Sequence, residues 1–358
     1  MLPVSIITGF LGSGKTTLLN RLLQHDSLKN SLVIINEFGE VGIDHLLVSA
    51  PAENMRLLAN GCLCCEVKGE LVETLTDVSL KRANGEIPAY DRVLIETTGL
   101  ADPVPIVQTI VTDTDLSKLY RLDTVVGVVD ALHAVSQLAA QGEVSKQIAV
   151  SDILLLSKTD LVDADALADV EAAVRKINGG AGLLKATHGD IHPDALFGRA
   201  APDGAARVAD LERWLAADNA TAQSKTRPGA YTVHAGDIST YTLFHEGPVT
   251  ASGLATWLSM LASFRGPQLL RVKGLINVGD TPYIIHAVQT VIHEPVELER
   301  WPSDDQRTRM VFIVRGVERA ALERTFAAFG MPESLGADAL QIDPAAYARF
   351  VEAAKQFI

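Results

Sequence analysis

The chain has 358 residues, enough for about two domains of roughly 150 residues each. Apolar residues make up 47% of the chain and charged residues 21%, which is typical of a globular protein and excludes a disordered or fibrous one. Lys and Arg number 31 against 44 Asp and Glu, a net charge of −13. We therefore expect neither nucleic acid nor an anionic membrane surface as a partner.

The chain has three cysteines, Cys62, Cys64 and Cys65, too tightly clustered for a disulfide framework. This usage is typical of a reducing compartment. The first apolar run has no basic segment before it and is broken by Gly9 and Gly12, unlike a signal peptide. No apolar stretch is long enough for a membrane span. We expect a soluble, cytoplasmic protein that does not bind membranes.

The first half of the chain predicts an α/β fold. Five continuous runs of Val, Ile and Leu are typical of strands buried on both faces: residues 4–7, 32–35, 93–95, 125–129 and 153–156. Helical stretches lie between such runs, at 16–24 and 163–177 for example. This alternation predicts a mainly parallel sheet flanked by helices.

The second half predicts a smaller α+β domain. Residues 218–229 are polar and contain Pro and Gly, as a linker does. The remaining elements are expected in this order: a segment at 231–245, a helix at 251–264, strands at 269–278, 283–292 and 309–314, and helices at 319–329 and 345–357. The predicted organisation is a first domain at 1–212, a linker at 213–229, a second domain at 230–335 and a helical tail at 336–358.

A phosphate-binding loop follows the first predicted strand. Residues 9–16, Gly-Phe-Leu-Gly-Ser-Gly-Lys-Thr, match G-x-x-x-x-G-K-[ST] at every fixed position. Backbone N–H groups of such a loop face phosphate oxygens, Lys15 reaches the β- and γ-phosphates, and the Thr16 hydroxyl binds Mg²⁺. The predicted nucleotide contacts are Gly9, Gly12, Ser13, Gly14, Lys15, Thr16 and Thr17.

A second motif indicates the base. The strand at 153–156 ends in Ser157-Lys158-Thr159-Asp160, which is similar to the guanine motif N-K-x-D with Ser in place of Asn. Asp160 can accept hydrogen bonds from guanine N1–H and the 2-amino group, which adenine lacks, and Lys158 lies along the base. The alternatives are an Asp160 that only caps the next turn, and an ATP-dependent kinase or ATPase.

Two further strand ends carry acidic residues. Glu96 and Gly99 follow the strand at 93–95, where Glu96 can hold Mg²⁺ and the Gly99 N–H can contact the γ-phosphate. Glu37 and Asp44 follow the strand at 32–35. These two loops are candidate switch segments. Glu37 and Asp44 can also be read as solvated loop acids.

Cys62, Cys64 and Cys65 form a C-x-C-C motif whose three thiolates can converge on one metal ion. Structural Zn²⁺ prefers four ligands, so an incompletely closed site suits a metal that is carried and handed on. The alternative is three buried, hydrophobic cysteines.

The histidines carry less information. His188 and His192 lie in a stretch with Gly and Pro where a regular helix is doubtful. His286 and His293 are seven positions apart in one predicted strand, so we expect them on opposite faces. We interpret them as solvated or core residues, although a loop position would allow one to be a fourth metal ligand.

The order of these motifs resembles the CobW/YjiA family of P-loop GTPases over residues 2–330. The stretches that carry the likeness are 9–20, 36–40, 61–65, 96–103, 129–131, 271–274 and 310–313. The chain departs from the family pattern at Ser157 and in having no His-rich tract.

The resemblance implies a GTP-hydrolysing metallochaperone that carries zinc, or cobalt in the cobalamin branch, to a client metalloprotein. It implies GTP and Mg²⁺ as cofactors and Cys62, Cys64 and Cys65 as metal ligands, with Glu37 as a helper. Lys15, Thr16, Glu96 and Gly99 would form the catalytic set. No arginine finger or water-positioning glutamine is evident, so slow hydrolysis is expected.

The cysteine motif lies between the two candidate switch segments, so GTP and metal binding are expected to be linked. A metal-responsive GTP switch that delivers nothing remains an alternative, as does cobalt delivery for cobalamin synthesis. Whether the chain forms an oligomer stays open.

Overall fold

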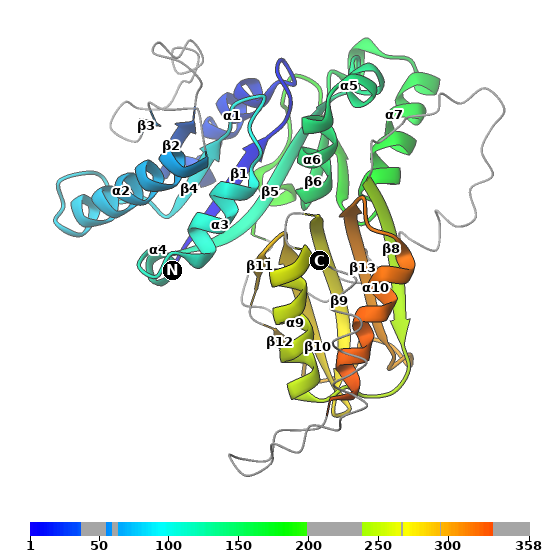
Figure 1. The fold of residues 1–358 in the computed structure, drawn as a ribbon. Helices are drawn as coiled ribbons and strands as arrows, with labels where there is room; N and C mark the ends of the chain where they lie inside the picture. The colour runs from blue at the N-terminus through cyan, green and yellow to red at the C-terminus, as the bar shows by residue number, and fades with distance from the viewer. Residues whose placement is uncertain (37–54, 59–63, 199–237, 266–267, 294, 332–358) are drawn as a thin grey trace. The chain divides into compact units, whose positions relative to one another are not determined.

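The computed structural model describes residues 1–36, 55–58, 64–198, 238–265, 268–293 and 295–331 (Figure 1). The chain divides into two compact units; of the described residues, 1–198 belong to the first and 238–331 to the second. The predicted linker, the helical tail and the helix at 345–357 lie outside the described residues, so the proposed domain limits stay predictions. No helix in the described ranges is long and apolar enough to cross a membrane.

The first unit is built on a parallel sheet, which confirms the predicted α/β class (Figure 1). Within the described residues it has seven strands in the order β3-β2-β4-β1-β5-β6-β7. Their bounds are β1 Leu2–Thr8, β2 Ser31–Asn36, β3 Met55–Leu58, β4 Arg92–Glu96, β5 Tyr120–Asp130, β6 Ile153–Ser157 and β7 Gly182–Lys185. The five predicted strands are present. The pattern misses the edge strands β3 and β7, which are short and contain no β-branched residue.

Helices cover both faces of this sheet. They are α1 Lys15–Leu23, α2 Cys64–Ala83, α3 Val104–Thr112, α4 Leu116–Leu119, α5 Ala134–Ala140, α6 Gly142–Val150 and α7 Ala164–Ile177. Leu18, Leu19 and Leu22 of α1 pack in one buried cluster with Val33 and Leu94 of the sheet. Helices α3 and α6 contact β5 and, among the described side chains, contribute none to that cluster, so they cover the opposite face, where α2 contacts α3. The predicted helices at 16–24 and 163–177 correspond to α1 and α7.

The carboxyl ends of the strands all lie at one edge of the sheet, because every pair is parallel. Loops that follow parallel strands at such an edge are where α/β proteins bind ligands. Three chemically distinctive segments of the described chain start there, after Thr8, after Glu96 and after Ser157, and the residues that follow Asn36 lie outside the described ones.

The second unit is an antiparallel sheet with helices packed on it, which confirms the predicted α+β class (Figure 1). Its elements are β8 Ile238–His245, α9 Ala251–Arg265, β9 Leu269–Val278, β10 Thr281–Val288, β11 Val291–Ile292, β12 Val296–Glu297, β13 Thr308–Arg315 and α10 Arg319–Thr325. Trp257 of α9 is fully buried beside Phe312, and its indole N–H donates to the Thr325 hydroxyl at 2.8 Å. The predicted helix at 319–329 is α10 followed by a 3₁₀ segment, Phe326–Gly330.

One sequence prediction about this unit is wrong. The expected single strand at 283–292 is a hairpin of β10 and β11, with Gln289 at a φ of +51°. The chain reverses there, so His286 in β10 and His293, directly after β11, lie side by side and not on opposite faces. Their rings stack with centroids 4.6 Å apart, and the His293 amide donates to the His286 carbonyl at 2.9 Å.

Candidate functional site

The loop between β1 and α1 has the geometry of a phosphate cradle. Gly9 has a φ of +148°, and a Cβ there would lie 2.3 Å from the Val128 carbonyl oxygen, so only glycine fits. Lys15 is buried, and its ammonium donates to the carbonyls of Gly9 at 2.9 Å and Phe10 at 3.1 Å. The helix α1 begins at Lys15, so the positive end of its dipole lies at the loop, an arrangement that suits an anion.

A hydroxyl and a carboxylate meet beside this loop. The Thr16 hydroxyl, on the first turn of α1, donates to Glu96 Oε1 at 2.8 Å. Glu96 ends β4 and is only 3% exposed. Oxygen atoms of these two kinds are the ligands that Mg²⁺ prefers, so the pair could hold that ion next to bound phosphates.

The loop that follows β4 packs directly on the phosphate loop. A Cβ added to Gly99 would lie 2.5 Å from the Leu11 amide nitrogen and 2.7 Å from its Cα, so the two backbones are in close contact. The loop is anchored at its start, because the Thr97 amide donates to the Ile7 carbonyl at 3.0 Å and the Thr97 hydroxyl to that of Thr8 at 2.9 Å.

A pocket of about 280 Å³ adjoins the phosphate loop at the end of β6. Its lining includes Gly14, Ser157, Lys158 and Asp160, so the structure brings the predicted base motif next to the predicted phosphate loop. The Ser157 hydroxyl donates to the Ser13 carbonyl at 2.6 Å and approaches the Val129 carbonyl at 3.2 Å. The short Ser157 side chain thus links the base motif to the phosphate loop, at the position where the motif usually has Asn.

Lys158 is held by a carboxylate that the sequence interpretation did not select. It has a φ of +54°, and its ammonium donates to Asp130 Oδ2 at 2.7 Å. The same oxygen lies 2.9 Å from His133 Nδ1, and Asp130 Oδ1 accepts from the Leu132 amide at 3.0 Å. Burial alone would raise the pKa of Asp130, but the hydrogen bonds from Lys158, His133 and Leu132 together hold that pKa below its usual range.

The loop after β7 also reaches the pocket. His188 and Gly189 line it; a Cβ on Gly189 would lie 3.0 Å from Leu18 Cα, and His188 Nε2 lies 3.9 Å from Asp160 Oδ2. His188 is therefore a neighbour of the base motif, a role that its sequence position did not suggest. The one available signal is that residues 186–189 follow a strand's carboxyl end, where ligands bind in such sheets.

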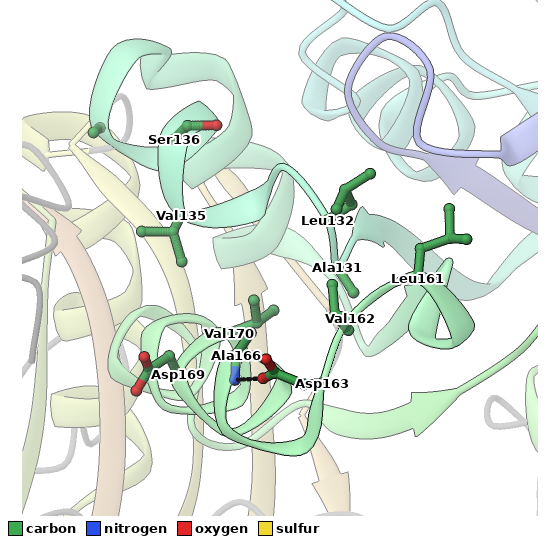
Figure 2. A pocket seen from close by; sticks show the side chains of 11 residues that line it. Ala131, Leu132, Val135, Ser136, Leu161, Val162, Asp163, Ala166, Asp169 and Val170 are labelled. Carbon is green, nitrogen blue, oxygen red and sulfur yellow. Dashed lines mark hydrogen bonds between the residues drawn. The ribbon is translucent and has the colours of Figure 1, made fainter.

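A larger, open hollow of about 660 Å³ lies between α5 and α7 and shares Leu161 with the base pocket (Figure 2). Its lining is mostly apolar, including Leu132, Val135 and Val170. The Asp163 carboxylate accepts from the Ala166 amide at 2.8 Å and caps α7, as the dashed line in Figure 2 shows. The lining, in the part of the chain described, offers no cation for phosphates, so this hollow does not fit a nucleotide.

The metal motif is described only in part. Cys64 and Cys65 are the first two residues of α2, and the chain leaves β2 at Asn36 and β3 at Leu58, which are register partners. Cys62, Glu37 and Asp44, and the side chains of Cys64 and Cys65, lie outside what the structure describes. Among the described residues, no group of three or more His, Cys, Asp or Glu could hold a metal ion.

Comparison with known proteins decides the family. Residues 3–185 match the CobW/HypB/UreG nucleotide-binding domain, and residues 238–330 match the cobalamin synthesis protein cobW C-terminal domain. The chain belongs to the CobW family. The resemblance predicted from the sequence motifs is therefore confirmed.

Two named relatives in the CobW family match this chain over most of its length. It is 31% identical over 330 residues to the zinc chaperone YjiA of Escherichia coli, which covers 91% of this chain and 98% of that protein. It is 27% identical to the zinc chaperone CobW of Sinorhizobium sp, with 91% and 97% covered. The crystal structure of the zinc-bound YjiA GTPase from E. coli superposes with a TM-score of 0.65 at 26% identity, covering 92% of this chain and 98% of that one.

Proposed function

We propose that this protein is a GTP-hydrolysing metallochaperone that binds a divalent metal, with zinc as the first candidate, and transfers it to a client metalloprotein. The observation that carries the proposal is the meeting of three loops around one phosphate cradle. The Thr16–Glu96 pair, the Gly99 loop and the base motif at 157–160 all contact or adjoin it. The zinc-chaperone and GTPase names of the relatives support the same reading.

The geometry supports a nucleotide role for each loop residue. Lys15 would exchange its two loop carbonyls for the β- and γ-phosphates, and the backbone of Gly9, Gly12, Ser13 and Gly14 would surround them. Thr17 lines the base pocket together with Asp160, whose carboxylate selects guanine.

Mg²⁺, when bound by Thr16 and Glu96, neutralises charge that develops on the phosphates during hydrolysis. Lys15 adds a second fixed positive charge, and Gly99 can offer its N–H to the γ-phosphate. None of these residues is an arginine that could act as a finger, so we expect intrinsic turnover to be slow.

Zinc is the cargo in this proposal, with Cys62, Cys64 and Cys65 as ligands and Glu37 as helper. Thiolates bind borderline cations such as Zn²⁺ well, and Co²⁺ can use the same ligands. An incompletely closed thiolate site favours release to an acceptor.

The sheet offers a short route between the two sites. Glu96 is the register partner of Ile7 on the phosphate-loop strand and of Ile35 on β2, and Asn36 of β2 is paired with Leu58 of β3. The strand that carries Glu96 is thus two strands from β3, or about 10 Å at the usual spacing. A change around the γ-phosphate can reach both strand ends that lead into the metal motif, and metal should in turn change GTP affinity.

The test loads the protein with one equivalent of Zn²⁺ and follows transfer to a chromogenic zinc chelator. Transfer should be fast with GTP and slow with GDP, ATP or a non-hydrolysable GTP analogue. The triple variant Cys62→Ser, Cys64→Ser, Cys65→Ser should bind GTP but hold no tight zinc. Lys15→Ala, the matched control for the nucleotide site, should hold zinc but lose the GTP dependence.

Equal transfer rates with GTP and with the analogue would contradict a delivery cycle driven by hydrolysis. The protein would then be a metal-responsive switch. Tight zinc binding by the triple variant would show that the three cysteines are not the zinc ligands. Loading with Co²⁺ in place of Zn²⁺ shows which ion responds to GTP.

A further inference from the structure

The loop after β4 is held by helix α6, which none of the nucleotide motifs includes. Gln147 of α6 donates from Nε2 to the Gly99 carbonyl at 3.2 Å and to the Ala101 carbonyl at 3.0 Å. One residue earlier, Lys146 Nζ lies 3.6 Å from Asp102 Oδ2. Two consecutive residues of α6 therefore hold residues 99–102.

The same loop touches the phosphate loop, because the Gly99 backbone is in close contact with Leu11. Gly99 thus contacts the phosphate loop directly and is bound through its carbonyl to Gln147. Its position relative to bound phosphates depends on both contacts.

Helix α6, which carries Gln147, is itself held in place by buried hydrogen bonds. Its carboxyl end is tied by Asn178, a fully buried residue whose amide donates to the carbonyls of Ile148 at 2.8 Å, Ala149 at 3.2 Å and Ser151 at 2.9 Å. The chain then enters β6, which ends at Ser157 of the base motif. Gln147 is therefore fixed relative to the base pocket, and side chains on rigid elements hold a site more accurately than loops do.

The chemistry of Gln147 separates this role from that of a water-positioning glutamine. The residue is only 2% exposed and its amide nitrogen donates to two carbonyls inside the protein, so the side chain faces the loop and not a solvent-accessible water. Its Oε1 is buried and has no hydrogen-bond partner within the described part of the chain. An unsatisfied buried acceptor costs stability, so packing alone would favour an apolar side chain here; what glutamine supplies is the pair of N–H donors.

We propose that Gln147 is a positioning residue for the γ-phosphate step, holding the Gly99 loop on the phosphate loop so that GTP is favoured over GDP and hydrolysed. This rests on the proposed function, in which the Gly99 N–H contacts the γ-phosphate. GDP lacks that phosphate, so GDP binding does not use the contact.

The experiment compares wild type with Gln147→Met, which keeps the side-chain length and removes both donors. Binding of GDP and of a non-hydrolysable GTP analogue is measured by fluorescence titration, and kcat at saturating GTP. Affinity for the analogue and kcat should each fall about tenfold, an effect within the range expected for the loss of two hydrogen bonds between neutral groups, while GDP affinity stays within about twofold. Gln141→Met, at an exposed position just before α6, is the matched control and should change none of these values.

A Gln147→Met variant that melts at a lower temperature but keeps the wild-type ratio of analogue to GDP affinity and the wild-type kcat would overturn the inference. Should that variant not fold, Gln147→Asn decides, since it keeps a buried amide that is too short to reach both carbonyls. If the wild-type protein neither prefers guanine nucleotides nor hydrolyses GTP, the proposed function itself is wrong.

Discussion

Removing the hydroxyl of Ser157 should weaken guanine nucleotide binding without slowing hydrolysis. That hydroxyl joins the base motif to the Ser13 carbonyl of the phosphate loop at 2.6 Å, across 144 positions of sequence. In Ser157→Ala the fully buried Ser13 loses this link. One such hydrogen bond contributes about 1 kcal/mol, which corresponds to about fivefold in affinity.

The loss should be equal for GDP and GTP, because the base and not the γ-phosphate depends on this contact. Fluorescence titration with labelled GDP and a non-hydrolysable GTP analogue gives both dissociation constants, and kcat at saturating GTP should match wild type. Ser157→Asn, which restores a donor to Ser13, should bind within about twofold of wild type.

Thr109→Val is the matched control, since the Thr109 hydroxyl also donates to a backbone carbonyl, that of Pro105 at 2.9 Å, but within α3 and away from the pocket. It should leave both affinities unchanged. If Ser157→Ala binds both nucleotides as wild type does, the two loops are held together by other contacts and the reasoning fails.

Three further changes test the rest of the site. Lys15→Ala should lower kcat by about 10²- to 10³-fold, since it removes a fixed charge at the transferring phosphate; steady-state phosphate release measures it, and wild-type turnover would rule out the phosphate-loop assignment. Asp160→Asn should raise the GTP dissociation constant roughly a hundredfold and improve xanthine nucleotide binding; equal competition by ATP and GTP in wild type would contradict the guanine reading. The lowered pKa of Asp130 means that its carboxylate contributes full stability above about pH 4, and that this contribution is lost as pH falls through the lowered value. Urea unfolding of wild type and Asp130→Asn should therefore show a stability gap that narrows below about pH 4, and a gap that widens in acid would contradict the ion pair with Lys158.

The sequence predicts the parts of the site that follow buried strands. Gly9 to Thr17 and Ser157 to Asp160 are recognisable because their residue types occur at fixed spacings next to Val, Ile and Leu runs. The parallel order of the strands then brings them to one edge of the sheet, so their proximity follows from the fold class.

Contacts between distant segments could not be predicted in the same way. Asp130 and Gln147 act on partners 28 and 48 positions away, and no local pattern distinguishes them from other polar residues near strands and helices. The hairpin that stacks His286 on His293 turns at Gln289 and Thr290, where no Gly, Pro or Asn signals a reversal. The sequence pattern therefore predicted one long strand where the chain forms two strands joined by a tight turn.

The strand that precedes the cysteine motif occupies the margin of the sheet. In the described part of the chain, β3 contributes four residues and has β2 as its one neighbour, whereas β1 and β4 are bordered on both sides. Local opening is least costly for segments with few backbone partners, so amide protons of Met55–Leu58 should exchange sooner than those of Leu2–Thr8. In the proposed delivery cycle, handing over a metal would then need only the opening of this margin, while the nucleotide stays bound at the central strands.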